Sequence, residues 1–243
     1  MLDAIAQGNI RPPQGIYEAS VQKNADLGYK IPFYDGRVYV YAKAGAALTV
    51  GNLIQAPVVD GTNDNSLAVQ TAVKADDREI KLTIPTGHAS FAANAYEGGW
   101  LIIEAGTEIG LARKIKGNTA FTTGAAATVT FYLRDKVGVA IAIAGHTAGI
   151  IACPYNGVIS NAGTGKILGG APVDVTDAYY FWLQVRGVGP AVATAAAIAV
   201  TEYVMANGVN VLKRATNLHA PIIGQAYSAF TASEAGLIYY MIE

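Results

Sequence analysis

Several groups of residues have types and spacings that could carry chemistry, and each falls short of a complete site. The glycine-rich segment Gly163-Thr164-Gly165-Lys166 invites comparison with a phosphate-binding loop. That pattern needs a glycine five residues before its Gly-Lys pair and Ser or Thr after the lysine. Ser160 and Ile167 stand at those two positions, and no glycine three residues after Gly165 completes a dinucleotide motif. We therefore interpret the segment as a plain loop.

The histidines and acidic residues likewise lack the partners that catalysis or metal binding needs. Three histidines are widely spaced among small or apolar neighbours, and we interpret each as a structural residue with a hydrogen-bonded ring: His88, His146 and His219. The acidic residues that lie close together in sequence are Glu97, Glu104 and Glu108, and Asp76 with Asp77. A glycosidase needs two carboxyl groups ~5–10 Å apart in a cleft, which sequence spacing does not establish. The chain also has no G-x-S-x-G nucleophile elbow. We predict no enzymatic activity, no catalytic residue, no metal site and no cofactor.

Charge and cysteine content narrow the function classes further. The net charge of -1 argues against a nucleic-acid binder, which needs a basic stripe to displace counterions. One basic cluster, Arg113, Lys114 and Lys116, is interpreted as a solvated strand edge or a salt-bridged contact between subunits. Cys153, the single cysteine, excludes an intrachain disulfide and is interpreted as a small buried hydrophobe. Charged residues make up 14% of the chain, below the ~25% of average domains, so we expect subunits or a lattice to cover part of its surface.

Two apolar stretches, residues 137–153 and 188–206, are too interrupted to span a membrane. His146 breaks the first, and Pro190 and Glu202 break the second, so neither supplies ~20 consecutive apolar residues. Both are predicted to be buried strands. The N-terminus lacks the basic and apolar regions of a signal peptide.

Alternation of apolar and polar residues predicts strands along much of the chain. It is clearest in residues 37–43, 79–84, 128–134, 180–186 and 237–242, and it places Leu82 inward and Lys81 outward. Turn clusters rich in Gly and Asn separate these runs, which predicts an all-β protein with one or more sandwich or barrel-like short-strand domains. Residues 190–206 could form a helix, but Asn207-Gly208 between two β-prone runs favours a hairpin. No internal repeat is convincing.

The first 36 residues differ from the rest, since they contain Pro12-Pro13 and no sustained period. We predict an extended N-terminal arm over residues 1–36, ordered where it lies on a neighbouring molecule. Residues 37–243 are predicted to form the β-rich part, either as one domain or as two β subdomains with a boundary near residues 136–175.

Aromatic residues on the polar faces of the predicted strands are candidate subunit contacts, because Tyr and Trp bury large areas at low entropic cost. The candidates are Tyr39, Tyr41, Tyr132, Tyr180 and Trp182. If a second sheet or a loop covers both faces, the same residues belong to the core. The sequence leaves both interpretations open.

Several short sequence segments occur along the chain in a recognisable order: residues 35–42, 47–53, 95–99, 114–118, 156–158 and 178–184. In these segments, and over about residue 30 to the C-terminus, the chain resembles a group of virion proteins from tailed bacteriophages described as head decoration or capsid-fibre proteins. It departs from that group at residues 109–113, where such proteins more often have Gly-x-Gly and an aromatic. The group has no motif with an assigned role, so no functional residue transfers.

The resemblance implies a non-enzymatic head decoration protein that binds and stabilises the lattice of the major capsid protein. It implies a homo-oligomer, trimeric or dimeric, on the capsid exterior of the virion and in the host cytoplasm during assembly, with no contact to nucleic acid or membrane. Exposed β-edges or arms would serve such binding by strand addition. The alternative is a tail or baseplate component, or a host-recognition fibre component that binds carbohydrate.

Overall fold

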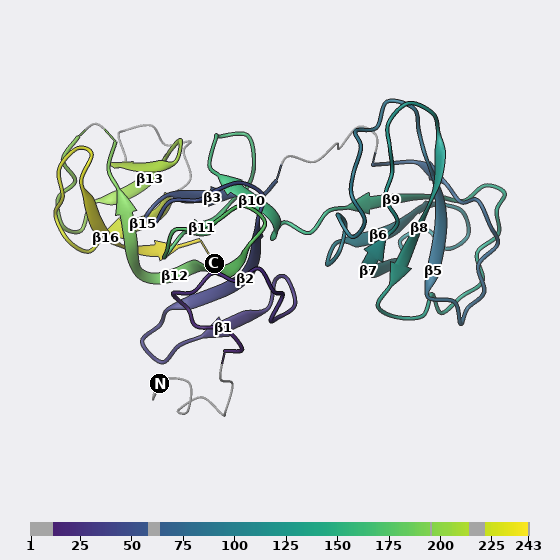
Figure 1. The fold of residues 1–243 in the computed structure, drawn as a ribbon, viewed down its shortest axis with the longest axis horizontal. Helices are drawn as coiled ribbons and strands as arrows, with labels where there is room; N and C mark the ends of the chain where they lie inside the picture. The colour runs from purple at the N-terminus through teal and green to yellow at the C-terminus, as the bar shows by residue number, and fades with distance from the viewer. Residues whose placement is uncertain (1–11, 58–63, 195, 214–221, 243) are drawn as a thin grey trace. The chain divides into compact units, whose positions relative to one another are not determined.

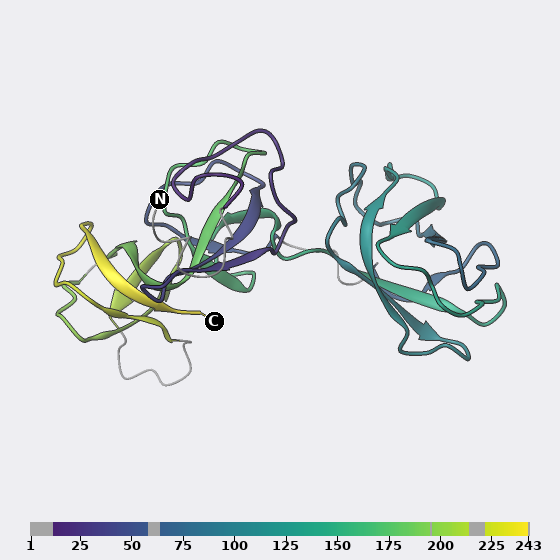
Figure 2. The same cartoon turned by 90° about the horizontal axis from the view of Figure 1, so that it is seen from below.

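The computed structural model describes residues 12–57, 64–194, 196–213 and 222–242, and in this part of the chain every regular element is a β-strand. The all-β prediction is therefore confirmed. The strands form two compact units, unit 1 from residues 1–58 and 157–243 and unit 2 from residues 59–156 (Figure 1, Figure 2). Unit 2 is thus an insertion into unit 1. The crossing after residue 156 lies within the boundary region predicted near 136–175, whereas nothing in the sequence indicated the crossing after residue 58.

Unit 1 begins with a ring of five strands, which we call barrel A. The ring runs β2, β10, β3, β11, β12 and closes because β12 pairs back onto β2. The strand bounds are β2 (Val38–Ala44), β3 (Leu53–Gln55), β10 (Asn156–Ser160), β11 (Ile167–Gly170) and β12 (Tyr180–Val192). A short strand, β1 (Lys30–Pro32), adds to the outer side of β2.

The second half of β12 belongs to another ring, barrel B, which completes unit 1. The ring runs β12, β16, β15, β13, β14, and a parallel bridge between Ala193 and Val211 returns β14 to the end of β12. Its further strands are β13 (Tyr203–Asn207), β14 (Asn210–Lys213), β15 (Ile222–Ala226) and β16 (Ala235–Met241). Asn207 pairs with Asn210 across a turn at Gly208 and Val209, so the hairpin favoured over a helix is confirmed.

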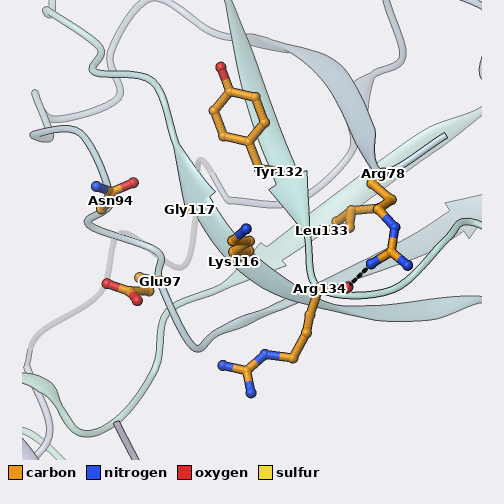
Figure 3. A pocket seen from close by; sticks show the side chains of 8 residues that line it. All are labelled: Arg78, Asn94, Glu97, Lys116, Gly117, Tyr132, Leu133 and Arg134. Atoms are coloured by element: carbon orange, nitrogen blue, oxygen red, sulfur yellow. Dashed lines mark hydrogen bonds between the residues drawn. The ribbon is translucent and has the colours of Figure 1, made fainter. Parts of the chain in front are cut away.

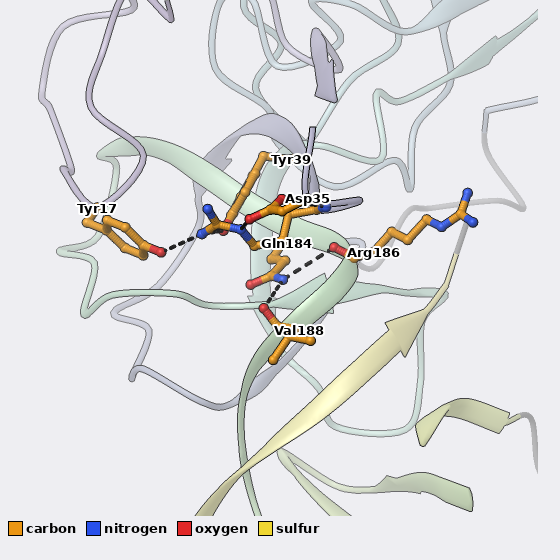
Figure 4. A network of polar contacts seen from close by, with 7 residues as sticks. Tyr17, Asp35, Tyr39, Gln184, Arg186 and Val188 are labelled. Atoms are coloured by element: carbon orange, nitrogen blue, oxygen red, sulfur yellow. Dashed lines mark hydrogen bonds and ion pairs between the residues drawn. The ribbon is translucent and has the colours of Figure 1, made fainter. Parts of the chain in front are cut away.

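β12 passes from barrel A to barrel B at an irregular step stabilised by one buried glutamine. The register of β12 on β2 shifts between Gln184 and Arg186, and Arg186 also begins the pairing with β16. The side-chain nitrogen of Gln184 donates to the carbonyl oxygens of Arg186 (3.3 Å) and Val188 (2.8 Å), as Figure 4 shows. A bulge leaves carbonyl groups without ladder partners, and this amide satisfies two of them inside the protein.

Unit 2 is a third ring, barrel C, with the order β4, β9, β6, β7, β8, β5. Val69, directly after β4, bridges Leu82 of β5 and closes the ring. The strands are β4 (Leu67–Ala68), β5 (Glu79–Ile84), β6 (Trp100–Ala105), β7 (Ala112–Asn118), β8 (Ala127–Leu133) and β9 (Thr147–Ile151). The predicted alternation holds in β5 and β8, whose inward residues, Leu82 and Phe131 among them, form the core of this barrel.

One local arrangement occurs six times among the described residues, twice in each barrel. A bridged apolar residue is followed three positions later by a residue with positive φ. The pairs are Leu48 with Gly51, Val175 with Ala178, Ile198 with Thr201, Phe230 with Ser233, Phe91 with Asn94, and Phe121 with Gly124. The bridges join Leu48 to Val175, Ile198 to Phe230 and Phe91 to Phe121. The sequence showed no convincing repeat, because the arrangement constrains two positions per turn and leaves the residue types open.

The N-terminal arm was predicted to be ordered by contact with a neighbouring molecule. Instead, its residues 12–36 pack against barrel A of their own chain. Gln14 is buried, and its amide nitrogen donates to the carbonyl oxygens of Glu18 (2.6 Å) and Tyr180 (3.0 Å). Its Oε1 accepts from the Tyr41 hydroxyl (2.8 Å), and its main-chain oxygen accepts from Trp182 Nε1 (3.0 Å). Residues 1–11 of the arm lie outside the described residues.

Candidate functional site

Three of the five aromatic residues considered as subunit contacts are part of the core. Tyr39, Tyr41 and Trp182 each have 0% of their surface exposed. β2 was predicted to be half-buried with its tyrosine face outward, but it is buried on both faces because the N-terminal segment covers that side. These three side chains therefore cannot line a contact between subunits.

Arg37, which packs against aromatic rings, helps to hold the N-terminal segment on β2. Arg37 donates to Asp35 Oδ2 (2.6 Å) and to the hydroxyls of Tyr17 (2.8 Å) and Tyr39 (3.2 Å), part of which Figure 4 shows. Its guanidinium also lies over the ring of Phe33 at 5.6 Å, a cation–π distance. Each of these partners comes from residues 12–39, so the cluster stabilises the local fold.

The remaining two aromatic candidates lie in different units. Tyr180 is half-buried and stacks on Tyr41 at 5.9 Å, with Lys43 Nζ 5.6 Å from its ring centre. Tyr132 is 41% exposed on β8 of unit 2. Three of the five candidates are thus buried, and Tyr132 lines a pocket on unit 2.

That pocket, of about 470 Å³, opens on the surface of barrel C and is the candidate functional site. Its volume lies within the ~300–1,000 Å³ common for small-molecule sites. Figure 3 shows Lys116 in the middle of the group, with Asn94 and Glu97 on one side and Arg78 on the other. The eight lining residues are Arg78, Asn94, Glu97, Lys116, Gly117, Tyr132, Leu133 and Arg134.

A β-bulge places the central lysine. Ile115 pairs with Leu133 and Gly117 pairs with Tyr132, so Lys116 is the extra residue of β7. Bulges re-aim side chains and occur often beside functional sites. The glycine at position 117 leaves room for this arrangement, because a Cβ atom there would meet Asn94 Oδ1 and the Asn94 side chain would have to shift.

Both walls of the pocket are hydrogen-bonded to the strands beneath. On one side, Asn94 N donates to the carbonyl oxygen of Asn118 (2.9 Å) and Gly98 N to that of Ile115 (2.9 Å), which attaches the turn carrying Glu97 to β7. Asn94 has φ +63°, a conformation that asparagine tolerates better than most residues. On the other side, the Arg78 guanidinium donates to the carbonyl oxygen of Arg134. The backbone of the turn that carries Asn94 and Glu97 and the side chain of Arg78 are therefore held by hydrogen bonds within the fold.

The sequence named several of these residues for other reasons. Glu97 was considered as one of a carboxylate cluster, Lys116 as one of a basic cluster, and Tyr132 as a subunit contact. These residues come together through the pairing of β7 with β8 and through the bulge. No local sequence pattern predicts either feature. Arg113, by contrast, donates to the carbonyl oxygens of Lys136 and Val137 and plays a structural part.

The other carboxylates of the predicted cluster have structural partners. Glu104 Oε2 accepts from the backbone of Ser66 (2.6 Å), and Glu108 Oε2 lies 2.6 Å from His146 Nε2. Asp76 forms an exposed ion pair with Lys136, and Asp77 accepts from the backbone of Lys74.

The histidines for which a structural role was predicted are hydrogen-bonded, as expected, where the structure describes them. His88 is buried, with Nδ1 2.7 Å from the carbonyl oxygen of Ala89 and Nε2 2.9 Å from Asp64 Oδ1. The Tyr96 hydroxyl donates to the same Oδ1 (2.6 Å). His219 lies outside the described residues.

Two further predictions are confirmed, that the glycine-rich segment is a plain loop and that Cys153 is buried. The Gly163–Lys166 segment is an irregular loop, and the buried Gln55 side chain bonds it at Thr164 Oγ1 (3.0 Å) and at the backbone of Ala162 (2.8 Å). Cys153 is buried, and burial raises the pKa of its thiol.

Glu108 provides a prediction about acid stability. Hydrogen bonds from Thr107 and His146 lower the pKa of this carboxyl below its ordinary value of 4.5. A group whose pKa is lower in the folded state stabilises the fold above its unfolded value, and this contribution is lost as the pH falls through the folded value. We expect the urea midpoint of the wild type to fall below pH 4.5 more steeply than that of Glu108→Gln.

The His146→Gln variant, which removes one of the two partners, is expected to flatten the same acid part of the profile. Urea titrations between pH 6 and pH 3 by circular dichroism would measure all three proteins. A slope in Glu108→Gln equal to that of the wild type would contradict this account.

Among the residues that the structure describes, no group of three or more His, Cys, Asp or Glu side chains is placed to hold a metal ion. Within the same residues, no helix is long and apolar enough to cross a membrane. Comparison of the chain with protein-family models, with curated proteins and with solved structures gave no match. Function must therefore be inferred from the residues and their geometry.

Proposed function

We propose that this chain is a non-enzymatic structural protein of a tailed-bacteriophage virion, which decorates the head by binding many times to the lattice of the major capsid protein. The resemblance of its sequence segments to head decoration proteins supports the virion location. The low share of charged residues supports a surface that is covered in use.

The observation that carries the proposal is an apolar outer face on barrel B. Leu237 and Met241 are 44% and 40% exposed and point the same way along β16 as Tyr239, because side chains alternate along a strand. The sheet register extends the face, since Tyr239 pairs with Gln225 and Gln225 pairs with Tyr203, which is 48% exposed. Tyr227 stands beside Leu237. Exposed apolar and aromatic side chains gathered on one sheet face, here around Gln225, are typical of protein-binding surfaces.

Barrel closure changes the expected mode of binding. Strand addition needs a free sheet edge, and among the described strands the rings leave such an edge at β1, which is three residues long. The main contact is therefore proposed to be side-chain packing by the apolar face of barrel B, either onto capsid subunits or onto other copies of this chain in a dimer or trimer.

The experiment mixes the purified full chain with shells assembled from the major capsid protein encoded in the same genome. Sedimentation followed by quantitative mass spectrometry gives the number of copies per shell. We expect one copy for every few capsid subunits, and loss of binding in the double variant Leu237→Glu/Met241→Glu. The control Ile143→Glu changes an exposed apolar residue of unit 2 and is expected to bind normally.

The opposite results would reject the proposal. A chain that leaves shells unbound, and that occurs in virions in a handful of copies, would instead support the tail or baseplate alternative. Light scattering of the free chain measures its self-association, and a monomer at high concentration that also ignores shells would leave the apolar face without a partner.

A further inference from the structure

We propose that the pocket on barrel C binds a sugar that carries a carboxylate group. The lining combines three cationic residues, Arg78, Lys116 and Arg134, with the exposed ring of Tyr132 and the polar side chains of Asn94 and Glu97. Capsid binding by the apolar face of barrel B does not depend on this pocket.

The charges favour an anionic ligand group. Against one carboxylate, Glu97, the lining sets three positive side chains, and charge-assisted hydrogen bonds to a carboxylate are roughly twice as strong as neutral ones. Lys116 is in the centre because the bulge of β7 directs it there. Among the eight lining residues, positive side chains outnumber negative ones by three to one, whereas the net charge of the whole chain is -1.

Glu97 and Tyr132 indicate that the rest of the ligand is a sugar. A carboxylate at the wall accepts hydrogen bonds from hydroxyl groups but repels phosphates and other dense anions. Asn94 adds a side chain that can both donate and accept. The Tyr132 ring offers a flat apolar surface with a polar tip, which suits a sugar ring that has an apolar face and hydroxyls at its edge.

The pocket is also held in shape, which lowers the entropic cost of binding. The turn of Asn94 and Glu97 is attached to β7 by backbone hydrogen bonds, and the Arg78 guanidinium is fixed on the main chain of Arg134. Gly117 leaves space for the observed Asn94 side chain, which would have to shift if a Cβ atom were present.

The test presents the full chain to a glycan array that contains uronate- and sialate-bearing oligosaccharides together with neutral ones. The strongest ligand is then titrated by calorimetry beside its carboxyl methyl ester, which keeps the ring and removes the charge. We expect binding to carboxylated sugars, and at least about tenfold weaker binding of the ester, a loss that corresponds to about 1.4 kcal/mol.

Two variants locate the site. Tyr132→Ala removes the ring and Lys116→Met removes the central charge while keeping a similar length, and each is expected to weaken binding about tenfold or more. Tyr227→Ala, which removes an exposed tyrosine of unit 1, is the matched control and is expected to bind like the wild type. Because the three changed side chains are exposed, we expect every variant to fold. Thermal unfolding followed by circular dichroism checks this.

Several results would overturn the inference. These are no binding to any glycan, equal binding of acid and methyl ester, or unchanged binding in both Tyr132→Ala and Lys116→Met. A decamer of glutamate bound as tightly as the best sugar would also overturn it, because the pocket would then recognise acidic peptide.

Discussion

Replacing Asp64 with alanine is expected to lower the free energy of unfolding of unit 2 by about 2–6 kcal/mol, because two buried groups each lose a hydrogen-bond partner at a cost of about 1–3 kcal/mol. The Asp64 and His88 side chains are 5% and 3% exposed, and their polar atoms lie 2.9 Å apart. Both ring nitrogens of His88 lie within hydrogen-bond distance of oxygen atoms, Nδ1 of the Ala89 carbonyl oxygen and Nε2 of Asp64 Oδ1. Without the carboxylate, His88 and the Tyr96 hydroxyl lose their shared partner inside the barrel.

The matched control is Asp76→Ala, the same chemical change at an exposed pair. Asp76 is 83% exposed and contacts Lys136, and exposed ion pairs contribute about 0–1 kcal/mol. Urea unfolding gives the size of each effect, and hydrogen exchange with mass spectrometry assigns it to unit 2. Equal losses in the two variants would show that the buried cluster does not stabilise the barrel.

A double variant, Asp64→Ala/His88→Ala, separates coupling from simple loss of packing. If the two residues act as a pair, the double variant loses less than the sum of the single variants, by about 0.5–3 kcal/mol. An additive double variant would mean that the two side chains stabilise the barrel independently.

The Leu82→Asp variant is expected to prevent folding of unit 2. Leu82 has 0% of its surface exposed, pairs with Val129 and bridges Val69 at the closure of barrel C. An aspartate there must either bury a charge or be protonated, and the lost packing alone costs about 2–5 kcal/mol. The sum approaches the total stability of a domain, about 5–15 kcal/mol.

Lys81→Asp, one residue away, is expected to be tolerated, because Lys81 is half-buried on the other face of β5. The soluble yield of both variants, followed by hydrogen exchange of the peptides that cover β5 and β8, measures the difference. Leu82→Ala supplies an intermediate case that is expected to fold with reduced stability. Equal tolerance of aspartate at positions 81 and 82 would show that the strand faces are assigned incorrectly.

The alternation in β5 and β8 was readable from the sequence because these strands are covered on one face, so polar and apolar residues separate cleanly. The same pattern in β2 left open whether Tyr39 and Tyr41 are subunit contacts or core residues, and the structure shows that they are core residues. Their outer face is covered by residues far away in sequence, with Gln14 as the main polar contact. A tyrosine face suits a core as well as a surface, so the period alone did not distinguish them.

The pocket also depends on contacts that the sequence pattern does not reveal. Glu97, Lys116 and Tyr132 were each conspicuous in the sequence, but nothing local places them together. Their meeting depends on the β7–β8 register, on the extra residue that the bulge inserts, and on a glycine that makes room for Asn94. Sequence separation hides such a site because each contributing strand is locally ordinary.

By itself, the sequence determined the fold class, because alternating residues and turn clusters favour β-strands. The scarcity of charge led only to the expectation of a covered surface. Only the tertiary structure decided that the strands close into three rings, that one unit is inserted into another, and that the turns repeat. The physical reason is that strand periodicity is a local property of the backbone, whereas ring closure depends on pairings such as Val69 with Leu82 and Ala193 with Val211, in which each partner carries an ordinary apolar side chain.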